Sequence, residues 1–339
     1  MEKWLTRVWY GNGVGGFLLL PLSLLYAAIM AVRGWAYKAG LFKTHRVAKP
    51  VIIVGNLTVG GTGKTPLVVW LAQRLAARGL KVAIVSRGYG SNGGPPREVS
   101  PVSANWREVG DEPVLLSRRS GCRVFVSEDR VAAANAAVKS GADVIISDDG
   151  LQHLRLARDC EIVVIDGARG LGNQRSLPAG PLRESARRLT NVDLVVTNGA
   201  RSLEGLGVQA PLTMKLAPSG VLPVRAATFL QSLADLRGRH VHAVAGIGNP
   251  VRFFEMLRAH GMQVIEHAFA DHHPFAPNEL IFSDGLPILM TEKDAVRAAS
   301  FANDHMYFVP VDAEFSEADA RRLLAGVDHA LNASQRATR

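Results

Sequence analysis

One stretch near the start of the chain, Val51–Pro66, combines a short apolar run, a cluster of glycines and a Lys-Thr pair. Val51–Val54 is a β-branched run of the kind found in buried parallel strands. The glycines within residues 60–63 allow successive backbone N–H groups to converge on one point, and a helix beginning at Lys64 directs the positive end of its dipole there. The sequence VIIVGNLTVGGTGKTP therefore predicts a strand, a phosphate cradle and a helix.

The order of side chains in this cradle suggests a role for each. Lys64 is expected to reach the β- and γ-phosphates of a nucleotide, and the Thr65 hydroxyl to ligate Mg²⁺. The usual pattern G-x-x-x-x-G-K-[ST] has glycine where this chain has Thr58, so the match is partial, and a glycine-rich turn without a ligand is the alternative. The residues predicted to contact the nucleotide are Thr58, Val59, Gly60, Gly61, Thr62, Gly63, Lys64 and Thr65.

A second strand-like run, residues 143–147, ends in an acidic pair, Asp148 and Asp149. A carboxylate at the carboxyl end of a buried strand, close to a phosphate cradle, is the usual partner of the nucleotide's Mg²⁺. One of the two is therefore expected to hold the metal, directly or through water. A tight D-D-G turn leaving the strand is the alternative.

Strand-like and helix-like runs alternate from Val51 onward, which indicates right-handed βαβ units. The predicted fold class is α/β: a P-loop NTPase-like core with a largely parallel sheet flanked by helices, and a second, smaller α/β domain. The 339 residues suffice for two domains. We expect an N-terminal membrane-anchoring segment over residues 1–49, the P-loop core over 50–230 and the smaller domain over 231–335.

The N-terminal segment carries no charged residue from Val8 to Val32, and Phe17–Val32 is almost wholly apolar. As a helix, the 16 residues of the apolar run cover about 24 Å, less than the roughly 30 Å hydrocarbon core of a bilayer. Pro21 is expected to interrupt this run. We predict a membrane-associated helix that is embedded or tilted in the bilayer, with a cleaved signal peptide and a buried core helix as alternatives.

The formal net charge of +9 is unevenly distributed, because residues 1–50 hold seven basic side chains and only one acidic side chain. A basic cluster beside an apolar segment indicates an anionic membrane surface and not a nucleic acid. Its position favours the cytoplasmic side of the membrane for this flank. Cys122 and Cys160 lie in apolar runs and are expected to be reduced core residues. No obligate protein partner is inferred.

Nine separated motifs occur in order over nearly the whole chain: NLTVGGTGKTP, SRGYG, GDEP, SEDR, SDDGLQH, LPAGPLRE, GIGNP, ADHHPF and MTEKDAV. This ordered set resembles the tetraacyldisaccharide 4′-kinases, the lipid A 4′-kinase family. A threonine in place of the first P-loop glycine is the form found in that family, so Thr58 agrees with the resemblance.

The resemblance implies a lipid kinase that transfers the γ-phosphate of ATP, with Mg²⁺, to the 4′-hydroxyl of a lipid A disaccharide 1-phosphate precursor in lipopolysaccharide synthesis. It implies a catalytic dyad of Asp111 in GDEP and His272 in ADHHPF, in which the carboxylate accepts the hydroxyl proton. Arg183 in LPAGPLRE would contact the transferring phosphate, and Arg130 in SEDR would serve the substrate or the structure. Without the resemblance, Asp111 would be a helix cap and His272 part of a polar loop.

Two other classes of protein share parts of this pattern. A membrane-targeted P-loop ATPase of the partitioning or sorting kind has a similar loop. Those proteins have a signature lysine before the two glycines, whereas this chain has Val59 there. A non-catalytic nucleotide-binding membrane scaffold would bind nucleotide without turnover. Labelled ATP separates the three classes, because the label ends on lipid, on free phosphate or on neither.

Overall fold

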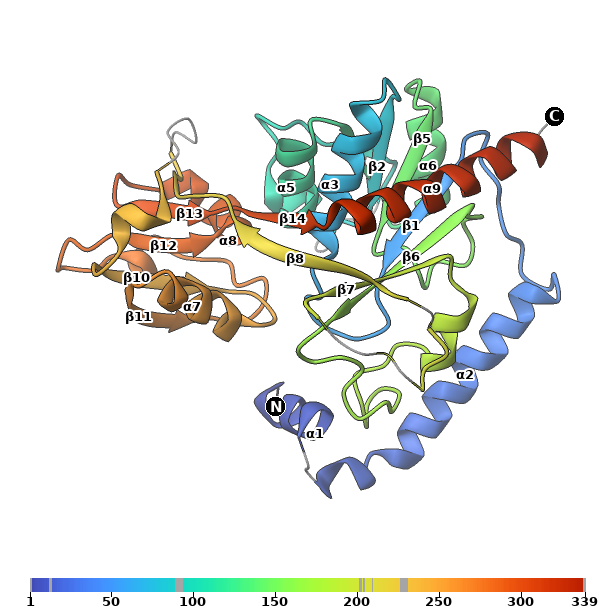
Figure 1. The fold of residues 1–339 in the computed structure, drawn as a ribbon, viewed down its shortest axis with the longest axis horizontal. Coiled ribbons are helices and arrows are strands. Elements are labelled where there is room, and N and C mark those ends of the chain that lie inside the picture. Colours follow the sequence, from blue (N-terminus) through green and yellow to red (C-terminus); the bar gives the residue numbers. More distant parts are fainter. Residues whose placement is uncertain are drawn as a thin grey trace.

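The computed structural model describes residues 2–11, 14–88, 94–200, 203, 205–208, 210–225 and 231–337. Tyr89 and Gly90 of the SRGYG motif and the expected domain boundary at residue 230 lie outside this part of the chain. Two lobes are visible, each built on its own sheet (Figure 1). The larger lobe carries the phosphate cradle, and the smaller lobe carries the ADHHPF and MTEKDAV motifs.

The larger sheet has nine strands in the order β14-β8-β7-β6-β1-β5-β2-β4-β3. Six of its neighbouring pairs are parallel, and only the two edge pairs are antiparallel. The parallel order confirms the predicted fold class. The strands are β1 (Val51–Gly55), β2 (Val82–Ser86), β3 (Arg97–Glu98), β4 (Arg123–Val126), β5 (Val144–Asp148), β6 (Cys160–Asp166), β7 (Leu194–Asn198), β8 (Leu212–Pro218) and β14 (Val311–Phe315).

Helices and loops cover both faces of this sheet, so its central strands are apolar on both sides. In β1, Ile52 and Val54 enter one core and Val51 and Ile53 enter the other. The long helix α9 (Glu317–Ala337) crosses the lobe and packs on the first core (Figure 1). The remaining helices of this lobe are α3 (Lys64–Ala76), α4 (Trp106–Val109), α5 (Asp111–Ser120), α6 (Arg130–Lys139) and the 3₁₀ helix η2 (Ala186–Asn191).

The smaller lobe is a five-stranded sheet in the order β11-β10-β12-β13-β9, parallel except for the last pair. Its strands are β9 (Leu222–Pro223), β10 (His240–Ala245), β11 (Gln263–Ala268), β12 (Ile288–Thr291) and β13 (Met306–Val309). Its helices are α7 (Pro250–Ala259), α8 (Glu292–Ala298), η3 (Leu233–Leu236), η4 (Pro277–Leu280) and η5 (Ala299–Phe301).

The chain crosses between the lobes at places that differ from the expected boundaries. β9 lies before residue 231 but pairs with β13 of the smaller sheet. β14 lies within 231–335 but pairs with β8 of the larger sheet, and α9 follows it there. The larger sheet extends past β7 through β8, which is long, half-exposed and carries a lysine and a proline. The three-part division of the chain remains a prediction as a set of folding units.

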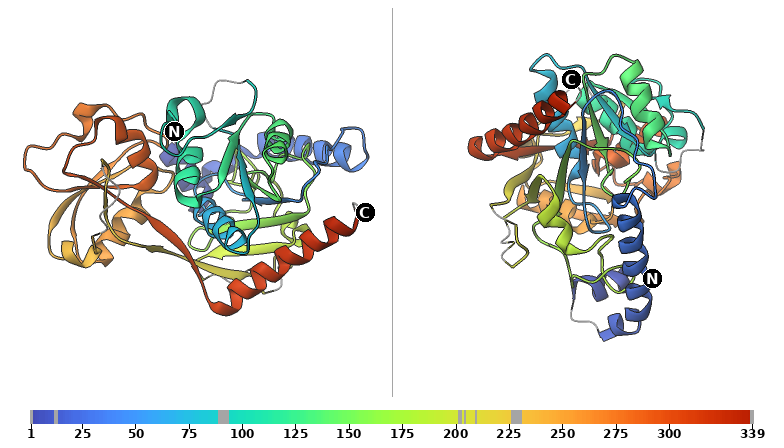
Figure 2. Two further views of the ribbon diagram at one scale, coloured as in Figure 1. Left: turned by 90° about the horizontal axis from the view of Figure 1, so that it is seen from above. Right: turned by 90° about the vertical axis from the view of Figure 1, so that its right-hand side faces the viewer.

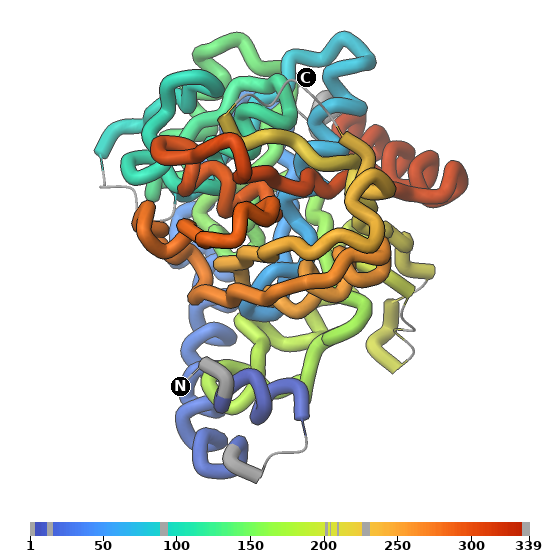
Figure 3. The backbone as a smooth tube through the Cα atoms, turned by 90° about the vertical axis from the view of Figure 1, so that its left-hand side faces the viewer, coloured from blue at the N-terminus to red at the C-terminus, as the bar shows by residue number. Residues whose placement is uncertain are grey.

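The N-terminal segment forms α1 (Glu2–Tyr10), the 3₁₀ turn η1 (Val14–Phe17) and α2 (Leu20–Lys38). Pro21 lies in the first turn of α2, where a missing N–H costs nothing, so it begins the helix and does not interrupt it. The right view of Figure 2 and Figure 3 show both helices at one end of the molecule. α2 is the one described helix that is long and apolar enough to cross a membrane, and 11% of its most apolar window is buried.

Candidate active site

The phosphate cradle follows β1 and ends at the first residue of α3. Gly60 and Gly63 have φ angles of +104° and +96°, a region that side chains other than glycine rarely adopt. A Cβ atom on Gly63 would lie 2.7 Å from the Asn198 side-chain nitrogen. Backbone conformation and close packing therefore both require glycine at position 63.

Thr58 occupies a place where the backbone needs no glycine. It forms an isolated β-bridge with Leu182, and its neighbour Val59 donates its N–H to the Pro181 carbonyl at 2.9 Å. The side chain of Asn56 donates to the Thr58 carbonyl at 2.8 Å. Because residue 58 is in an extended bridge and buried, threonine fits there, which explains physically why this loop departs from the usual pattern.

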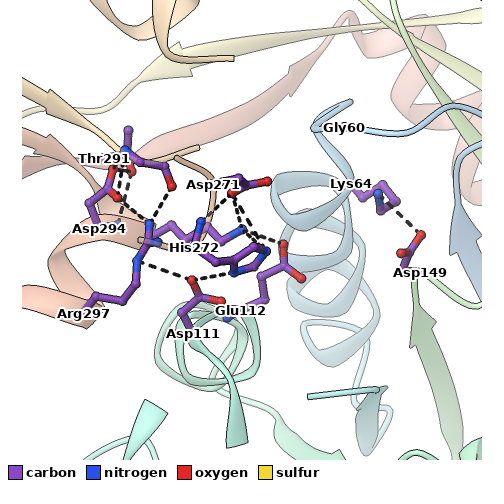
Figure 4. Close-up of polar contacts among 12 residues, drawn as sticks. Gly60, Lys64, Asp111, Glu112, Asp149, Asp271, His272, Thr291, Asp294 and Arg297 are labelled. Atoms are coloured by element: carbon purple, nitrogen blue, oxygen red, sulfur yellow. Dashed lines mark hydrogen bonds and ion pairs between the residues drawn. The ribbon is translucent and has the colours of Figure 1, made fainter. Parts of the chain in front are cut away.

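The acidic pair lies beside the cradle, as predicted from the strand end. Asp148 is the last residue of β5 and Asp149 follows with a φ of +49°. Lys64 Nζ lies 3.5 Å from Asp149 Oδ1 (Figure 4). Arg183 Nη1 lies 3.1 Å from Asp149 Oδ2. Burial alone would raise the pKa of Asp149, but the charges of Lys64 and Arg183 outweigh it and lower the pKa to about 2.

Asp148 is the deeper carboxyl of the pair. Burial and the charges of Glu112 and Asp149 raise the pKa of Asp148 to about 7. Among the described residues, its buried Oδ1 atom has no hydrogen-bond partner. A buried carboxylate that lacks a partner fits a cation, and Mg²⁺ commonly takes only one or two carboxylates together with phosphate oxygens and water. This donor set, with the Thr65 hydroxyl, fits nucleotide-bound Mg²⁺.

Arg130 binds the backbone of the turn that carries Asp148 and Asp149. Its Nη2 atom donates to the Asp148 carbonyl at 2.9 Å, and burial lowers the pKa of Arg130 to about 10. This contact is compatible with the structural alternative expected for Arg130. Its Nε and Nη1 atoms, buried and without partners among the described residues, remain available to an anion.

We expect Asp148→Asn to flatten the pH dependence of stability in protein kept free of divalent cations with EDTA. The Asp148 pKa is about 7 in the folded chain, whereas an unfolded aspartate titrates near ~4. Between these values the folded state retains a proton that the unfolded state releases, so the wild type loses stability as the pH rises. Its melting temperature should fall by on the order of 5 °C more than that of the variant from about pH 5 to about pH 7.5. Equal falls in melting temperature for the wild type and the variant would show that Asp148 is not the source of this pH dependence.

The residues expected to form a dyad are in contact across the two lobes. His272 Nδ1 lies 3.1 Å from Asp111 Oδ2 (Figure 4). Asp111 is the first residue of α5, and its Oδ1 atom also accepts the Glu112 backbone N–H at 2.9 Å, but the N-cap of the helix is Gly110. His272 has a φ of +59°, a strained conformation for a residue with a side chain. Sequence spacing did not indicate this contact, which joins residues 161 positions apart.

A basic cluster that motif reasoning left without a role surrounds the dyad. Lys293 Nζ lies 3.2 Å from His272 Nε2 and 3.2 Å from Glu112. Burial alone would lower the pKa of Lys293, but the carboxylates of Glu112, Asp111 and Asp271 raise it, so it stays charged and donates to Nε2. With Lys293 donating to Nε2, the Nδ1–H of His272 donates to Asp111.

Arg297 completes this cluster from α8. Its side chain is fully buried, pairs with Asp294 and lies 3.5 Å from Asp111. Burial alone would raise the pKa of Asp111, but the hydrogen bond from His272 and the charges of Lys293 and Arg297 hold it below the ordinary value. The MTEKDAV motif was the signal for Lys293, whereas Arg297 lies just beyond it and only the fold reveals its contact.

One cavity of about 1390 Å³ is lined by residues of both lobes. Its lining comes from the cradle, the acidic pair, Arg183, the small-lobe residues His272 and Lys293, and α2. The Asp111 side chain is 4% exposed and lies behind His272, which is 28% exposed. No described group of three or more His, Cys, Asp or Glu side chains is arranged to hold a metal ion by itself.

A phosphate cradle after β1, beside an aspartate pair after β5 in a parallel sheet, defines a P-loop nucleotide-binding protein. The family model described as tetraacyldisaccharide-1-P 4′-kinase matches residues 16–328. The chain belongs to this family, which confirms the resemblance seen in its motifs.

Individual relatives agree over nearly the whole chain. The tetraacyldisaccharide 4′-kinase of Alkalilimnicola ehrlichii is 48% identical over 310 residues, covering 91% of this chain and 92% of that protein. The tetraacyldisaccharide 4′-kinase of Methylobacillus flagellatus is 46% identical over 326 residues, covering 96% of each. The crystal structure of LpxK from Aquifex aeolicus in complex with ATP superimposes with a TM-score of 0.77 at 29% identity, over 93% of this chain and 99% of that one.

Proposed function

We propose that this chain transfers the γ-phosphate of ATP to the 4′-hydroxyl of a tetraacyldisaccharide 1-phosphate, a step of lipid A synthesis. The observation that carries the proposal is a cavity between the lobes, in which a P-loop and its acidic pair face a histidine that is backed by an aspartate. An ATPase needs a positioned water, whereas a pair of this kind in an open cavity suits a hydroxyl acceptor.

The nucleotide would be held by the cradle from Thr58 to Thr65. Lys64 would face the β- and γ-phosphates, and the N-terminal end of α3 would add N–H groups for the same charge. Thr65, Asp148 and Asp149 would hold Mg²⁺, which neutralises charge on the β- and γ-phosphates when it is bound. Arg183, whose guanidinium already lies beside Asp149, would contact the transferring phosphate.

In the reaction, the 4′-oxygen forms a bond to the γ-phosphorus while the bond to the β,γ-bridging oxygen breaks, and ADP leaves. The hydroxyl proton passes to the dyad. We expected the Asp111 carboxylate to take it directly. Because Asp111 lies behind His272, we now propose that Nε2 of the imidazole exchanges its hydrogen bond from Lys293 for one from the hydroxyl. Asp111 then orients the ring and balances its positive charge. Transfer of this kind depends more on positioning and charge than on a strong base.

Labelled ATP with a tetraacyl disaccharide 1-phosphate in detergent tests the reaction. Label on the lipid, dependent on Mg²⁺, is expected. Label only on free phosphate would favour the ATPase alternative, and bound nucleotide without turnover would favour a scaffold. Either result would overturn the proposed function.

The N-terminal helix suits a substrate that resides in a bilayer. Along α2, side chains of Ser23, Tyr26 and Arg33 bond to loops of the larger lobe over about 15 Å of helix. The apolar side chains that remain exposed on or next to α2 are Phe17, Leu18, Leu22, Leu24, Leu25, Ile29, Val32, Trp35, Leu41 and Phe42. A helix bonded lengthwise to its own protein lies in the membrane interface, so we propose that it docks on the inner membrane and does not span it.

Some of the basic residues that follow α2 form ion pairs within the protein, so fewer of them are left to meet a membrane than the sequence suggested. Arg46 pairs with Asp159 at 2.6 Å, and Lys49 lies 3.4 Å from Asp143. Lys38 and Lys43 are exposed, and we propose that they meet the anionic headgroups of the cytoplasmic leaflet.

Replacing Leu25 and Ile29 together by serine should weaken binding to anionic vesicles at least about tenfold, because each buried aliphatic side chain contributes about 1.5–3 kcal/mol. Their exposed fractions are 59% and 57%, so the fold should tolerate the change. Vesicle pelleting measures the effect, and Val102→Ser, at an exposed aliphatic residue on a distant loop, is the control. Unchanged pelleting of the double variant would count against an interfacial helix.

A further inference from the structure

The protein-facing side of α2 bonds to the loops that carry the candidate transfer residues. Ser23 Oγ donates to the Ser176 carbonyl at 2.7 Å, and the Tyr26 hydroxyl donates to the Arg183 carbonyl at 3.0 Å. Arg33 Nη2 donates to the Gln152 carbonyl at 3.0 Å, three residues after Asp149. All three acceptors are backbone atoms, so the contacts hold the course of these loops.

Residues 181–183 are bonded to the phosphate cradle as well as to α2. The Arg183 N–H donates to the Leu57 carbonyl at 2.7 Å, and the Val59 N–H donates to the Pro181 carbonyl at 2.9 Å. Leu182 forms the bridge with Thr58. The segment therefore lies between the P-loop and α2, and Arg183 has its N–H held by the former and its C=O held by the latter.

The backbone position of Arg183 matters because it sets where the guanidinium group lies, next to Asp149. Arg183 Nη1 lies 3.1 Å from Asp149, which in turn lies 3.5 Å from Lys64. Arginine has a long side chain, and a small shift of its backbone is carried to the guanidinium. A misplacement of about 1 Å can cost a large part of the rate of a transfer reaction.

We propose that α2 is a positioning element of the transfer site, and that Tyr26 is the residue through which it holds Arg183. The two sides of the helix then have separate tasks. The exposed side meets the membrane, and the bonded side sets the position of Arg183 relative to the cradle. The inference rests on the proposed function, in which Arg183 contacts the transferring phosphate.

Tyr26→Phe removes only the hydroxyl and should lower kcat for lipid phosphorylation by about fivefold to tenfold in detergent micelles. The KM for ATP should stay within about twofold, since the cradle keeps its glycines and Lys64. Vesicle binding and the melting temperature should match those of the wild type. Tyr37→Phe is the matched control, because Tyr37 is on the same helix and its ring contacts Phe42 and Arg33.

A double-mutant cycle separates positioning from a general effect of the helix. Arg183→Ala alone should lower kcat strongly, and Tyr26→Phe should add nothing in that background. The inference is overturned if Tyr26→Phe keeps full kcat, or if it lowers kcat by the same factor with and without Arg183. It is also overturned if Arg183→Ala keeps full kcat. The proposed function is judged separately, by whether the wild type labels the lipid.

Discussion

Asp111→Asn is expected to lower kcat by about 10²–10⁴-fold, the contribution typical of a positioned acid–base group. The amide keeps the size of the side chain but cannot balance a charged imidazole, and its nitrogen can present an N–H to His272 Nδ1 in place of an acceptor. The KM values for ATP and lipid should change little, because the side chain is buried behind His272. Steady-state kinetics with the lipid acceptor measure the effect.

Asp319→Asn is the matched control for this change. Asp319 also lies in the first turn of a helix, α9, where it accepts the Thr213 N–H and pairs with Arg322. Its replacement should leave kcat within about twofold, since Asp319 and its partners Thr213 and Arg322 do not line the cavity. If both variants lost activity equally, or if Asp111→Asn kept full kcat at saturating substrates, the dyad would have no part in the reaction.

Lys64→Ala should reduce kcat by about 10²–10³-fold and raise the KM for ATP, because it removes the cation closest to the phosphates. A second consequence follows from the ion pair with Asp149. Without Lys64, that carboxylate keeps only Arg183 among its nearest cations, so phosphate and carboxylate charges repel each other more strongly. Nucleotide affinity measured by calorimetry should fall together with kcat.

Lys215→Ala, on the exposed part of β8, controls for the loss of one positive charge. It should leave both nucleotide affinity and kcat unchanged within about twofold, because an exposed charge is screened by solvent. Wild-type affinity in the Lys64 variant would show that the glycine loop does not hold the nucleotide phosphates.

The site illustrates which residues a sequence can indicate by itself. The cradle is local: a buried strand, glycines at positive φ and a helix start are properties of one continuous stretch, and they appear as predicted. Asp148 and Asp149 were found because carboxyl ends of parallel strands share one edge. The pairing of Asp111 with His272, by contrast, came from the family resemblance, since nothing in their spacing relates them.

The sequence by itself determined the strand before the P-loop, the strand that ends in the acidic pair, the P-loop and the apolar helix, because each depends on residues close together in the chain. Only the tertiary structure decided which distant groups meet. It extended the larger sheet through β8 and β14 and brought Lys293 and Arg297 to the dyad. It also brought the Tyr26 hydroxyl to the Arg183 carbonyl. Such contacts join residues as far apart as Asp111 and Arg297, and no local pattern records them, since they depend on how the chain passes between two lobes.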